Sequence, residues 1–382
     1  MTNDKKDWIN DALTFVSART RDNLERVTDF PESAKDGVWE YARNKPGGWV
    51  GGHWTGLLWL AFAHTGDKLF GQAAREWTAR LAPRQNDTST HDLGFLFELS
   101  HVLGAQLTGD ALLKLPALNA ARSLIQRFNA KGRFIRAWGA LDTPTNRGRA
   151  IIDTMMNLDL LYWATRETGD QLFAQIATAH ARAALKYQVR PDWSTSHVMD
   201  FDPDTGMFLK QDTHQGLSAT SCWSRGQAWA VYGFAETYRN TGDAAFLDAL
   251  RNLAEYCLRR APADHVPYWD YDSPLIPNDV RDSSAAAILA SGMLILAEQD
   301  HANAERWRGE AVTILESLWQ NYTSRGTSEP SILIHATRSK PHGAMDSGLI
   351  YGDYYFVEAL MRMSAPTKVC VDGEARALHF CA

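Results

Sequence analysis

Two kinds of helical segment alternate along the chain. Six segments carry apolar or small residues on most faces, which is typical of helices buried all round: WTGLLWLAFAH, LGFLFELSHVLGAQL, IIDTMMNLDLLYWATRE, RGQAWAVYGFAETYRN, DSSAAAILASGMLILAEQ and YGDYYFVEALMRMS. Six others are polar on one face, at about 6–26, 69–81, 111–128, 172–187, 244–259 and 304–322. The pattern predicts inner helices paired with outer helices. Strands are expected only as small hairpins in the loops.

A repeated tripeptide, TGD, separates four of these inner segments from the outer segment that follows, at 65–67, 108–110, 168–170 and 241–243. Glycine suits the left-handed conformation that closes a helix, and aspartate suits the N-cap of the next helix. Each TGD is therefore predicted to be a tight turn between antiparallel helices. Six such pairs predict an all-α fold, an (α/α)6 barrel, with residues 1–382 as one domain.

The connections from each outer helix to the next inner one are long, at about 30–52, 130–149, 189–223, 261–281 and 323–350. They hold most of the aromatic and histidine residues that lie outside the helices, and long loops in a compact domain are usually functional. All emerge at the end of the barrel where the inner helices begin. Helix N-termini favour anions, so the pattern predicts a cleft for an acidic ligand at that end.

Composition argues against several classes of function and favours one kind of ligand. The net charge is -6 and no basic run is present, which argues against nucleic-acid binding. The four cysteines lack metal-site spacing, so neither a zinc site nor a disulfide framework is expected. No segment is long enough to span a membrane, and the polar N-terminus lacks an export signal, so a cytoplasmic location is expected. Fourteen tryptophans favour a sugar-binding cleft, where flat rings stack on pyranose faces.

The expected cleft gathers carboxylates, one arginine and several aromatic residues. Asp153 follows two isoleucines in an apolar run, a costly place for an idle charge, so we predict a catalytic role for it. Asp92 is a second candidate, with a helix cap as its alternative. Arg225 either binds the ligand or pairs with a buried aspartate, and Asp282 is expected to be a cap. Further candidates are Trp49, His53, His91, Trp138, His197, His214, Gln215, Trp229, Trp269 and Tyr351.

Eight strings occur in order between about residues 49 and 358: HDLGF, AWG, IIDTMMNL, THQG, WSRGQAW, YWDYD, RDSSA and YGDYY. In this order and spacing they resemble the unsaturated glucuronyl hydrolases of glycoside hydrolase family 88. The related unsaturated rhamnogalacturonyl hydrolases share the barrel but fit HDLGF and SRGQAW less well. The resemblance implies an enzyme that takes lyase-generated oligosaccharides ending in a C4=C5 unsaturated uronate, with no metal or organic cofactor.

The resemblance also implies roles for individual residues. Family enzymes hydrate the double bond rather than attack the anomeric carbon, and Asp153 stands at the general acid/base position. Asp92 stands at the second aspartate, which holds ring hydroxyls and favours the protonated form of Asp153. Arg225, Gln215 and His197 are implied to engage the substrate or its carboxylate. Trp49, Trp138, Trp229 and Trp269 are candidate stacking platforms, and His53 replaces an aromatic residue of some relatives at a position expected to face the pocket.

Other interpretations remain open at this stage. A conventional inverting glycosidase on the same barrel would act on saturated glycosides, using two carboxylates spaced to admit a water molecule. A non-catalytic helical-repeat protein would bind sugars without turnover. The basic segment 335–345 either contacts a sulfate or carboxylate on the aglycone or is a solvated loop. Oligomeric state is open between monomer and homodimer, and the parent polysaccharide is open too.

Overall fold

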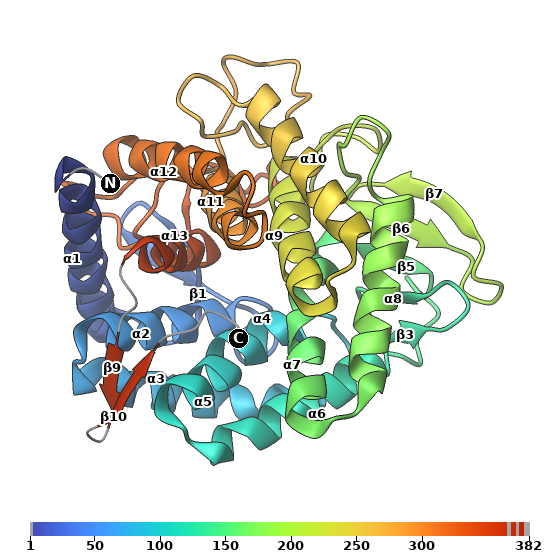
Figure 1. The fold of residues 1–382 in the computed structure, drawn as a ribbon, viewed down its shortest axis with the longest axis horizontal. Helices are drawn as coiled ribbons and strands as arrows, with labels where there is room; N and C mark the ends of the chain where they lie inside the picture. The colour runs from blue at the N-terminus through green and yellow to red at the C-terminus, as the bar shows by residue number, and fades with distance from the viewer. Residues whose placement is uncertain (1–2, 365–367, 372–373, 378–382) are drawn as a thin grey trace.

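The chain is mainly helical in the computed structural model, which describes residues 3–364, 368–371 and 374–377. Outer helices surround an inner set of helical segments (Figure 1). The outer helices are α1 (Asn3–Arg26), α3 (Lys68–Leu81), α6 (Lys114–Ile125), α8 (Gln171–Tyr187), α10 (Ala244–Arg260) and α12 (Ala304–Asn321). Each buries one face, as in α3, where the buried Phe70, Ala74 and Trp77 recur at helical spacing.

The inner segments are buried nearly all round, as their sequences predict. They are α2 (Gly51–Thr65), α4 (Leu93–Phe97) continued by α5 (Leu103–Thr108), α7 (Asp159–Thr168), α9 (Ser224–Thr241), α11 (Ser283–Gln299) and α13 (Ile350–Met363). In α11 every residue from Ser283 to Ala297 is buried. Neighbouring inner segments pack against one another in chain order, and α13 packs back against α2. The inner segments therefore form a closed ring.

The four TGD turns have the predicted conformation. Their glycines have φ between 64° and 76°, the left-handed region, and each aspartate side chain accepts a hydrogen bond from the backbone N–H two residues later. Outer helices α3, α8 and α10 accordingly lie against the inner helices α2, α7 and α9, and α12 lies against α11 without a TGD turn between them. The turns keep each outer helix antiparallel to its inner partner.

Three helices differ in detail from the expected ranges. The helix expected over 111–128 is a 3₁₀ turn, Ala111–Leu113, followed by α6, because Pro116 is tolerated only in the first turn of a helix. A π-helical segment, Glu98–Val102, joins α4 to α5. The third inner helix opens with a 3₁₀ segment, Ile152–Asn157. Such departures from α-helix geometry often accompany functional sites.

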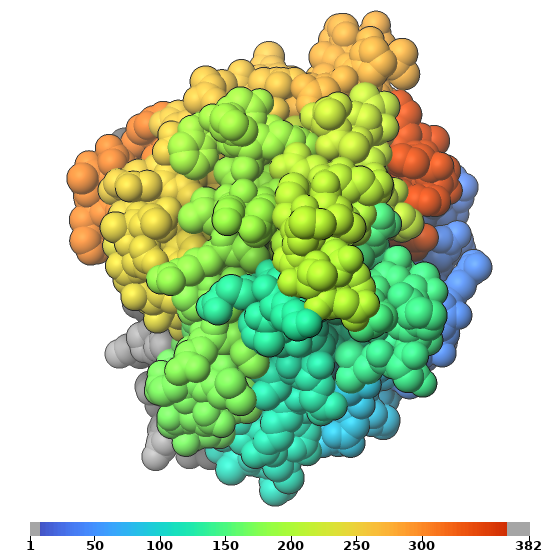
Figure 2. Space-filling model, turned by 90° about the vertical axis from the view of Figure 1, so that its right-hand side faces the viewer, coloured from blue at the N-terminus to red at the C-terminus, as the bar shows by residue number. Residues whose placement is uncertain are grey.

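Small strands occupy the long links. They are β1 (Pro31–Lys35), β2 (Val38–Tyr41), β3 (Phe128–Asn129), β4 (Phe134–Ile135), β5 (Arg149–Ile151), β6 (Val198–Phe201), β7 (Phe208–Asp212), β8 (Gly348–Leu349), β9 (Lys368–Val371) and β10 (Glu374–Ala377). They form the sheets β2-β1-β8 and β5-β6-β7 and the hairpins β3-β4 and β9-β10. The β6–β7 hairpin projects at the right of Figure 1 and faces the viewer in Figure 2. None of the described helices is both long and apolar enough to cross a membrane.

Candidate active site

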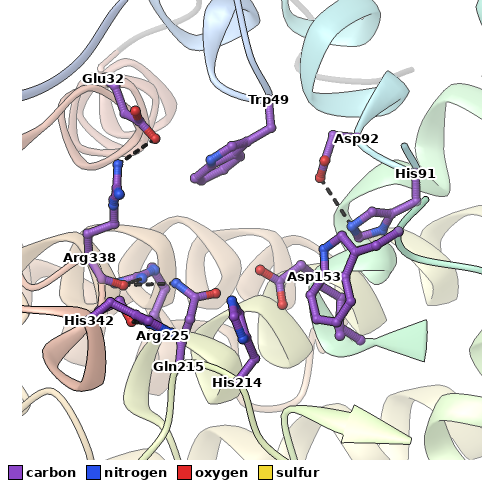
Figure 3. A pocket seen from close by; sticks show the side chains of 13 residues that line it. Glu32, Trp49, His91, Asp92, Asp153, His214, Gln215, Arg225, Arg338 and His342 are labelled. Carbon is purple, nitrogen blue, oxygen red and sulfur yellow. Dashed lines mark hydrogen bonds and ion pairs between the residues drawn. The ribbon is translucent and has the colours of Figure 1, made fainter. Parts of the chain in front are cut away.

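A cavity of about 280 Å³ lies at the end of the inner ring where the helices begin. Its walls come from the long links and from the first turns of the inner segments, which is the location that the sequence predicts. The lining residues are Glu32, Trp49, His91, Asp92, Trp138, Ile151, Asp153, His214, Gln215, Arg225, Arg338, Ser339 and His342. Figure 3 shows Asp92, His91 and Asp153 toward one side of this cavity and Glu32, Arg338 and His342 toward the other.

Asp153 lies in the 3₁₀ turn that opens the third inner segment and is only 8% exposed. Its Oδ2 atom is 3.4 Å from Nε2 of the buried His197, and neither atom has a hydrogen-bond partner among the described residues. Nδ1 of His197 accepts the backbone N–H groups of His214 and Gln215, each at 3.1 Å. These two donors place the imidazole proton on Nε2, where it points at the Asp153 carboxylate.

Opposing effects set the acidity of Asp153. Burial disfavours the carboxylate and acts to raise the pKa of Asp153. The neighbouring His197 acts in the other direction, as does the charge of Arg225, and together they hold that pKa below its usual value. Asp153 is therefore an ionised carboxylate at neutral pH.

Asp92 occupies the N-cap position of α4, but its side chain makes no capping hydrogen bond. Instead, Oδ1 lies 3.2 Å from Nε2 of His91, and Oδ2 accepts the hydroxyl of Thr90 at 2.5 Å. Nδ1 of His91 lies 2.8 Å from the Thr154 hydroxyl. Burial lowers the pKa of His91, so its neutral ring can donate from Nε2 to Asp92. The alternative of a helix-capping side chain is wrong for Asp92, because its carboxylate belongs to the cavity.

The structure confirms one of the two alternatives for Arg225, because its side chain pairs with a buried aspartate. Its guanidinium is 1% exposed, and Nη1 lies 2.5 Å from Oδ2 of Asp282. Nη1 also donates to the carbonyl oxygen of Thr337 at 2.6 Å, and Nη2 donates to that of Arg338 at 2.5 Å. Asp282 is the cap of α11, as predicted, accepting the backbone N–H of Ser284. Arg225 lines the cavity and contributes positive charge there, while these bonds use both N–H groups of Nη1 and one of the two on Nη2.

Four more of the predicted residues line the cavity, namely His214, Gln215, Trp49 and Trp138. Gln215 donates from Nε2 to the carbonyl oxygen of Arg338 at 2.9 Å. The ring of Trp138 meets that of His214 edge to face, with 5.3 Å between centroids. Trp49 stands across the cavity from Gln215 and His214 in Figure 3. Of the four tryptophans predicted as stacking platforms, Trp49 and Trp138 line the cavity.

Five predicted site residues are buried and do not line the cavity, namely His53, His197, Trp229, Trp269 and Tyr351. Trp229 is fully buried against Phe95, and Trp269 is buried with its indole N–H donated to Asp279. The expectation that their rings face the substrate is wrong. Trp229 follows Arg225 by four residues, so it lies one helical turn, about 6 Å, deeper in α9. His53 and Tyr351 are also fully buried, and burial lowers the pKa of His53 to about 3.

The structure adds residues that the sequence did not single out. Glu32, Ile151, Arg338, Ser339 and His342 line the cavity. The last three belong to the basic segment 335–345, which was a visible signal of this role. Glu32 gave no such signal, because it is a single acidic residue in a short strand. In the described part of the chain, no three His, Cys, Asp or Glu side chains are placed to hold a metal ion.

Known proteins share this sequence and fold. The model of Glycosyl Hydrolase Family 88 matches residues 20–295. An unsaturated glucuronyl hydrolase from Bacillus sp. (strain GL1) is 38% identical over 363 residues, which are 93% of this chain and 95% of the relative. The crystal structure of the unsaturated glucuronyl hydrolase from Bacillus sp. GL1 has a TM-score of 0.87 at 36% identity, over 94% of this chain and 97% of that one.

A third similarity concerns a structure with bound sugar. A mutant unsaturated glucuronyl hydrolase from Streptococcus agalactiae, complexed with dGlcA-GalNAc6S, has a TM-score of 0.79 at 30% identity. That match covers 93% of this chain and 90% of the relative. The family match covers well over half of the residues, and the alignments to both relatives run nearly end to end. The chain therefore belongs to glycosyl hydrolase family 88, as its ordered motifs predict.

Proposed function

We propose that this chain removes the 4,5-unsaturated uronate from the non-reducing end of lyase-generated oligosaccharides by hydrating its double bond. We also infer that residues 1–382 form one catalytic domain, an (α/α)6 barrel, which the closed inner ring and the packing of outer helices around it support. Family membership and the dGlcA-GalNAc6S complex of the relative from Streptococcus agalactiae support the substrate class.

The observation that carries the proposed mechanism is the carboxylate of Asp153. It is buried in the cavity wall, its Oδ2 has no hydrogen-bond partner within the part of the chain that the structure describes, and it faces a histidine whose tautomer is fixed by the backbone. An idle carboxylate at such a place is costly, whereas a general acid/base needs this combination of burial and access. Asp92 is tied to His91 and Thr90, so it is the better placed of the two to bind and orient ring hydroxyls.

The reaction needs one proton donor that later becomes a proton acceptor. In its acid form, Asp153 gives its proton to C4 while the electrons of the double bond form the new C–H bond. A water oxygen bonds to C5, and the water proton passes to the Asp153 carboxylate. The resulting hemiketal opens to a ketone at C5, the bond from C1 to the aglycone oxygen breaks, and the aglycone leaves protonated. The sum is the uptake of one water molecule.

Binding of the substrate changes the acidity of Asp153 in the direction that the first step requires. The uronate brings a carboxylate into the cavity, and its ring displaces water. Added negative charge and stronger desolvation both favour the neutral acid, so both raise the pKa of Asp153. The charge of Arg225, which lines the same cavity, attracts the uronate without being released from Asp282. His197 keeps the carboxylate oriented throughout.

The fate of hydrogen tests this mechanism. In D₂O, the proposed route places one carbon-bound deuterium at C4 of the uronate product at the moment of cleavage. The early product is analysed by mass spectrometry, and incubation of that product without enzyme measures uncatalysed exchange. The absence of deuterium at C4, or equally fast cleavage of a saturated glucuronide, would favour an inverting glycosidase. Binding without any loss of the ultraviolet absorbance of the double bond would favour a sugar-binding protein.

A further inference from the structure

The charges of the basic segment 335–345 are compensated by carboxylates in the folded chain. Three of its basic side chains each face a carboxylate, in the pairs His335–Asp346, Arg338–Glu32 and Lys340–Asp279. Nδ1 of His342 is bonded to the Ser339 hydroxyl at 2.7 Å. Among these basic groups, Arg338 and His342 line the cavity. The sequence of this segment suggests an anion-binding loop, but what the folded chain presents to the cavity is the Arg338–Glu32 ion pair.

Glu32 reaches this position because of an irregularity in β1. Pro31 pairs with Tyr41 and Ser33 pairs with Glu40, so Glu32 is the extra residue of a β-bulge. Bulges redirect side chains and are common beside active sites. Ser33 also pairs with Leu349 of β8, which fixes β1 against the link that carries Arg338. The carboxylate of Glu32 consequently lines the cavity, with Oε1 2.8 Å from Nη1 of Arg338.

The ion pair lies where the leaving part of the substrate is expected. Asp153 and Asp92 mark the reacting uronate, and Glu32 and Arg338 stand on the opposite side of the cavity in Figure 3. The backbone of Arg338 is held there by Arg225 and Gln215, which both donate to its carbonyl oxygen. The pair is therefore a fixed feature of the wall that an aglycone sugar would meet.

We infer that Glu32 is a specificity-determining residue that selects substrates whose aglycone is uncharged, an inference that rests on the proposed function. A sulfate or carboxylate on the aglycone would have to take Arg338 from Glu32 and then lie beside the Glu32 carboxylate. Such a like-charge contact is strongly unfavourable. A neutral sugar avoids that contact, and its hydroxyl groups can donate hydrogen bonds to the same carboxylate oxygens.

The test uses two substrates that differ only in the 6-sulfate group of the aglycone, dGlcA-GalNAc and dGlcA-GalNAc6S. The wild type is expected to have the higher kcat/KM on dGlcA-GalNAc. Glu32→Gln should shift the ratio of the two kcat/KM values toward the sulfated substrate by about tenfold. The matched control is Glu40→Gln, which removes an equal charge from the exposed face of the same sheet and should leave the ratio unchanged.

A second substitution tests the role of the ion pair itself. Adding Arg338→Gln to Glu32→Gln should abolish the gain on the sulfated substrate, because the gain depends on a released arginine. A gain that persists in the double variant, an unchanged ratio in Glu32→Gln, or a wild type that prefers the sulfated substrate would each overturn the inference. The pair is partly exposed, with 37% of Arg338 and 15% of Glu32 accessible, so the variants are expected to fold.

The wild-type comparison does not depend on any variant and keeps the inference falsifiable if one does not fold. The same two substrates distinguish a failure of this inference from a failure of the proposed function. A wild type that cleaves neither disaccharide would contradict the hydrolase assignment. A wild type that cleaves both, with equal or greater efficiency on dGlcA-GalNAc6S, would leave that assignment intact and contradict only the role of Glu32.

Discussion

Replacement of Arg225 by methionine separates a structural role from a substrate-binding role. Methionine keeps the length of the apolar stem between Trp223 and Tyr351, whose ring centroids lie 4.5 and 5.3 Å from the guanidinium carbon. It removes the charge and the hydrogen bonds to Asp282, Thr337 and Arg338. The change therefore tests whether the guanidinium holds α9, α11 and the last link together.

The structure sets the size of the expected effect. Removing one partner of a buried ion pair costs about 3–5 kcal/mol, because it leaves an uncompensated buried charge. The Asp282 carboxylate retains N–H donors from Ser284 and Ala285 and the Ser284 hydroxyl at 2.5 Å. The Arg338 carbonyl retains its bond from Gln215. These remaining bonds place the loss in unfolding free energy near the lower limit, at about 3 kcal/mol.

Urea unfolding followed by circular dichroism measures this loss. Arg147→Met is the matched control, because the Arg147–Asp204 pair is 45% and 73% exposed and its loss should change stability by less than about 0.5 kcal/mol. The double variant Arg225→Met/Asp282→Asn removes the uncompensated charge and should recover part of the stability. If Arg225→Met unfolds within 1 kcal/mol of the wild type while KM rises sharply, Arg225 is a direct substrate ligand and the reasoning is refuted.

Three further outcomes are expected. Asp153→Asn should lower turnover by about 10²–10⁴-fold with an unchanged circular dichroism spectrum; near-normal turnover would exclude Asp153 as the acid/base. His197→Asn keeps an acceptor for the two backbone N–H groups but removes the Nε2–H donor, so the pKa of Asp153 should rise and the alkaline limb of kcat/KM should move to higher pH. Burial first, and then the carboxylates of Asp159 and Glu236, raise the pKa of Glu98, so the folded state holds a proton there that the unfolded state releases above about pH 4.3. Unfolding free energy should therefore fall as pH rises from that value, and Glu98→Gln should flatten the fall in urea midpoints measured between pH 5 and 8.

The order of inner and outer helices could be predicted because burial leaves a local pattern in sequence. A helix with one polar face and a helix that is apolar on all faces have different residue patterns over about fifteen residues. The TGD turns mark where four of the inner helices end. The π-helical segment at Glu98–Val102 could not be predicted, because its causes lie in packing against other segments. The strand pairing of β1 with β8 joins residues more than three hundred positions apart and leaves no local mark.

Two of the misplaced site residues, His53 and Trp229, share one geometric cause. A helix that is apolar all round gives no indication of which turn reaches the cavity. Trp49 and His53 are four residues apart, as are Arg225 and Trp229, and in each pair the first lines the cavity while the second is buried. One turn is about 6 Å, which is enough to pass from the wall of the cavity into the floor beneath it. Depth along an inner helix, rather than residue type, decides which side chain can touch a substrate.

Ion pairs between distant links explain why the charge preference of this cavity could not be predicted from the sequence. The basic segment 335–345, considered alone, predicts an anion-binding loop, and its location at the cavity supports that prediction. What the segment offers a substrate depends on carboxylates from other links, Glu32 for Arg338 and Asp279 for Lys340. Neither carboxylate is near its partner in sequence, so the net charge at the cavity wall appears only once the links are folded together. The same segment on the same barrel could therefore accept an anionic aglycone if position 32 held a neutral residue, and substrate preference in this chain would then be set by a strand that contains none of the predicted catalytic residues.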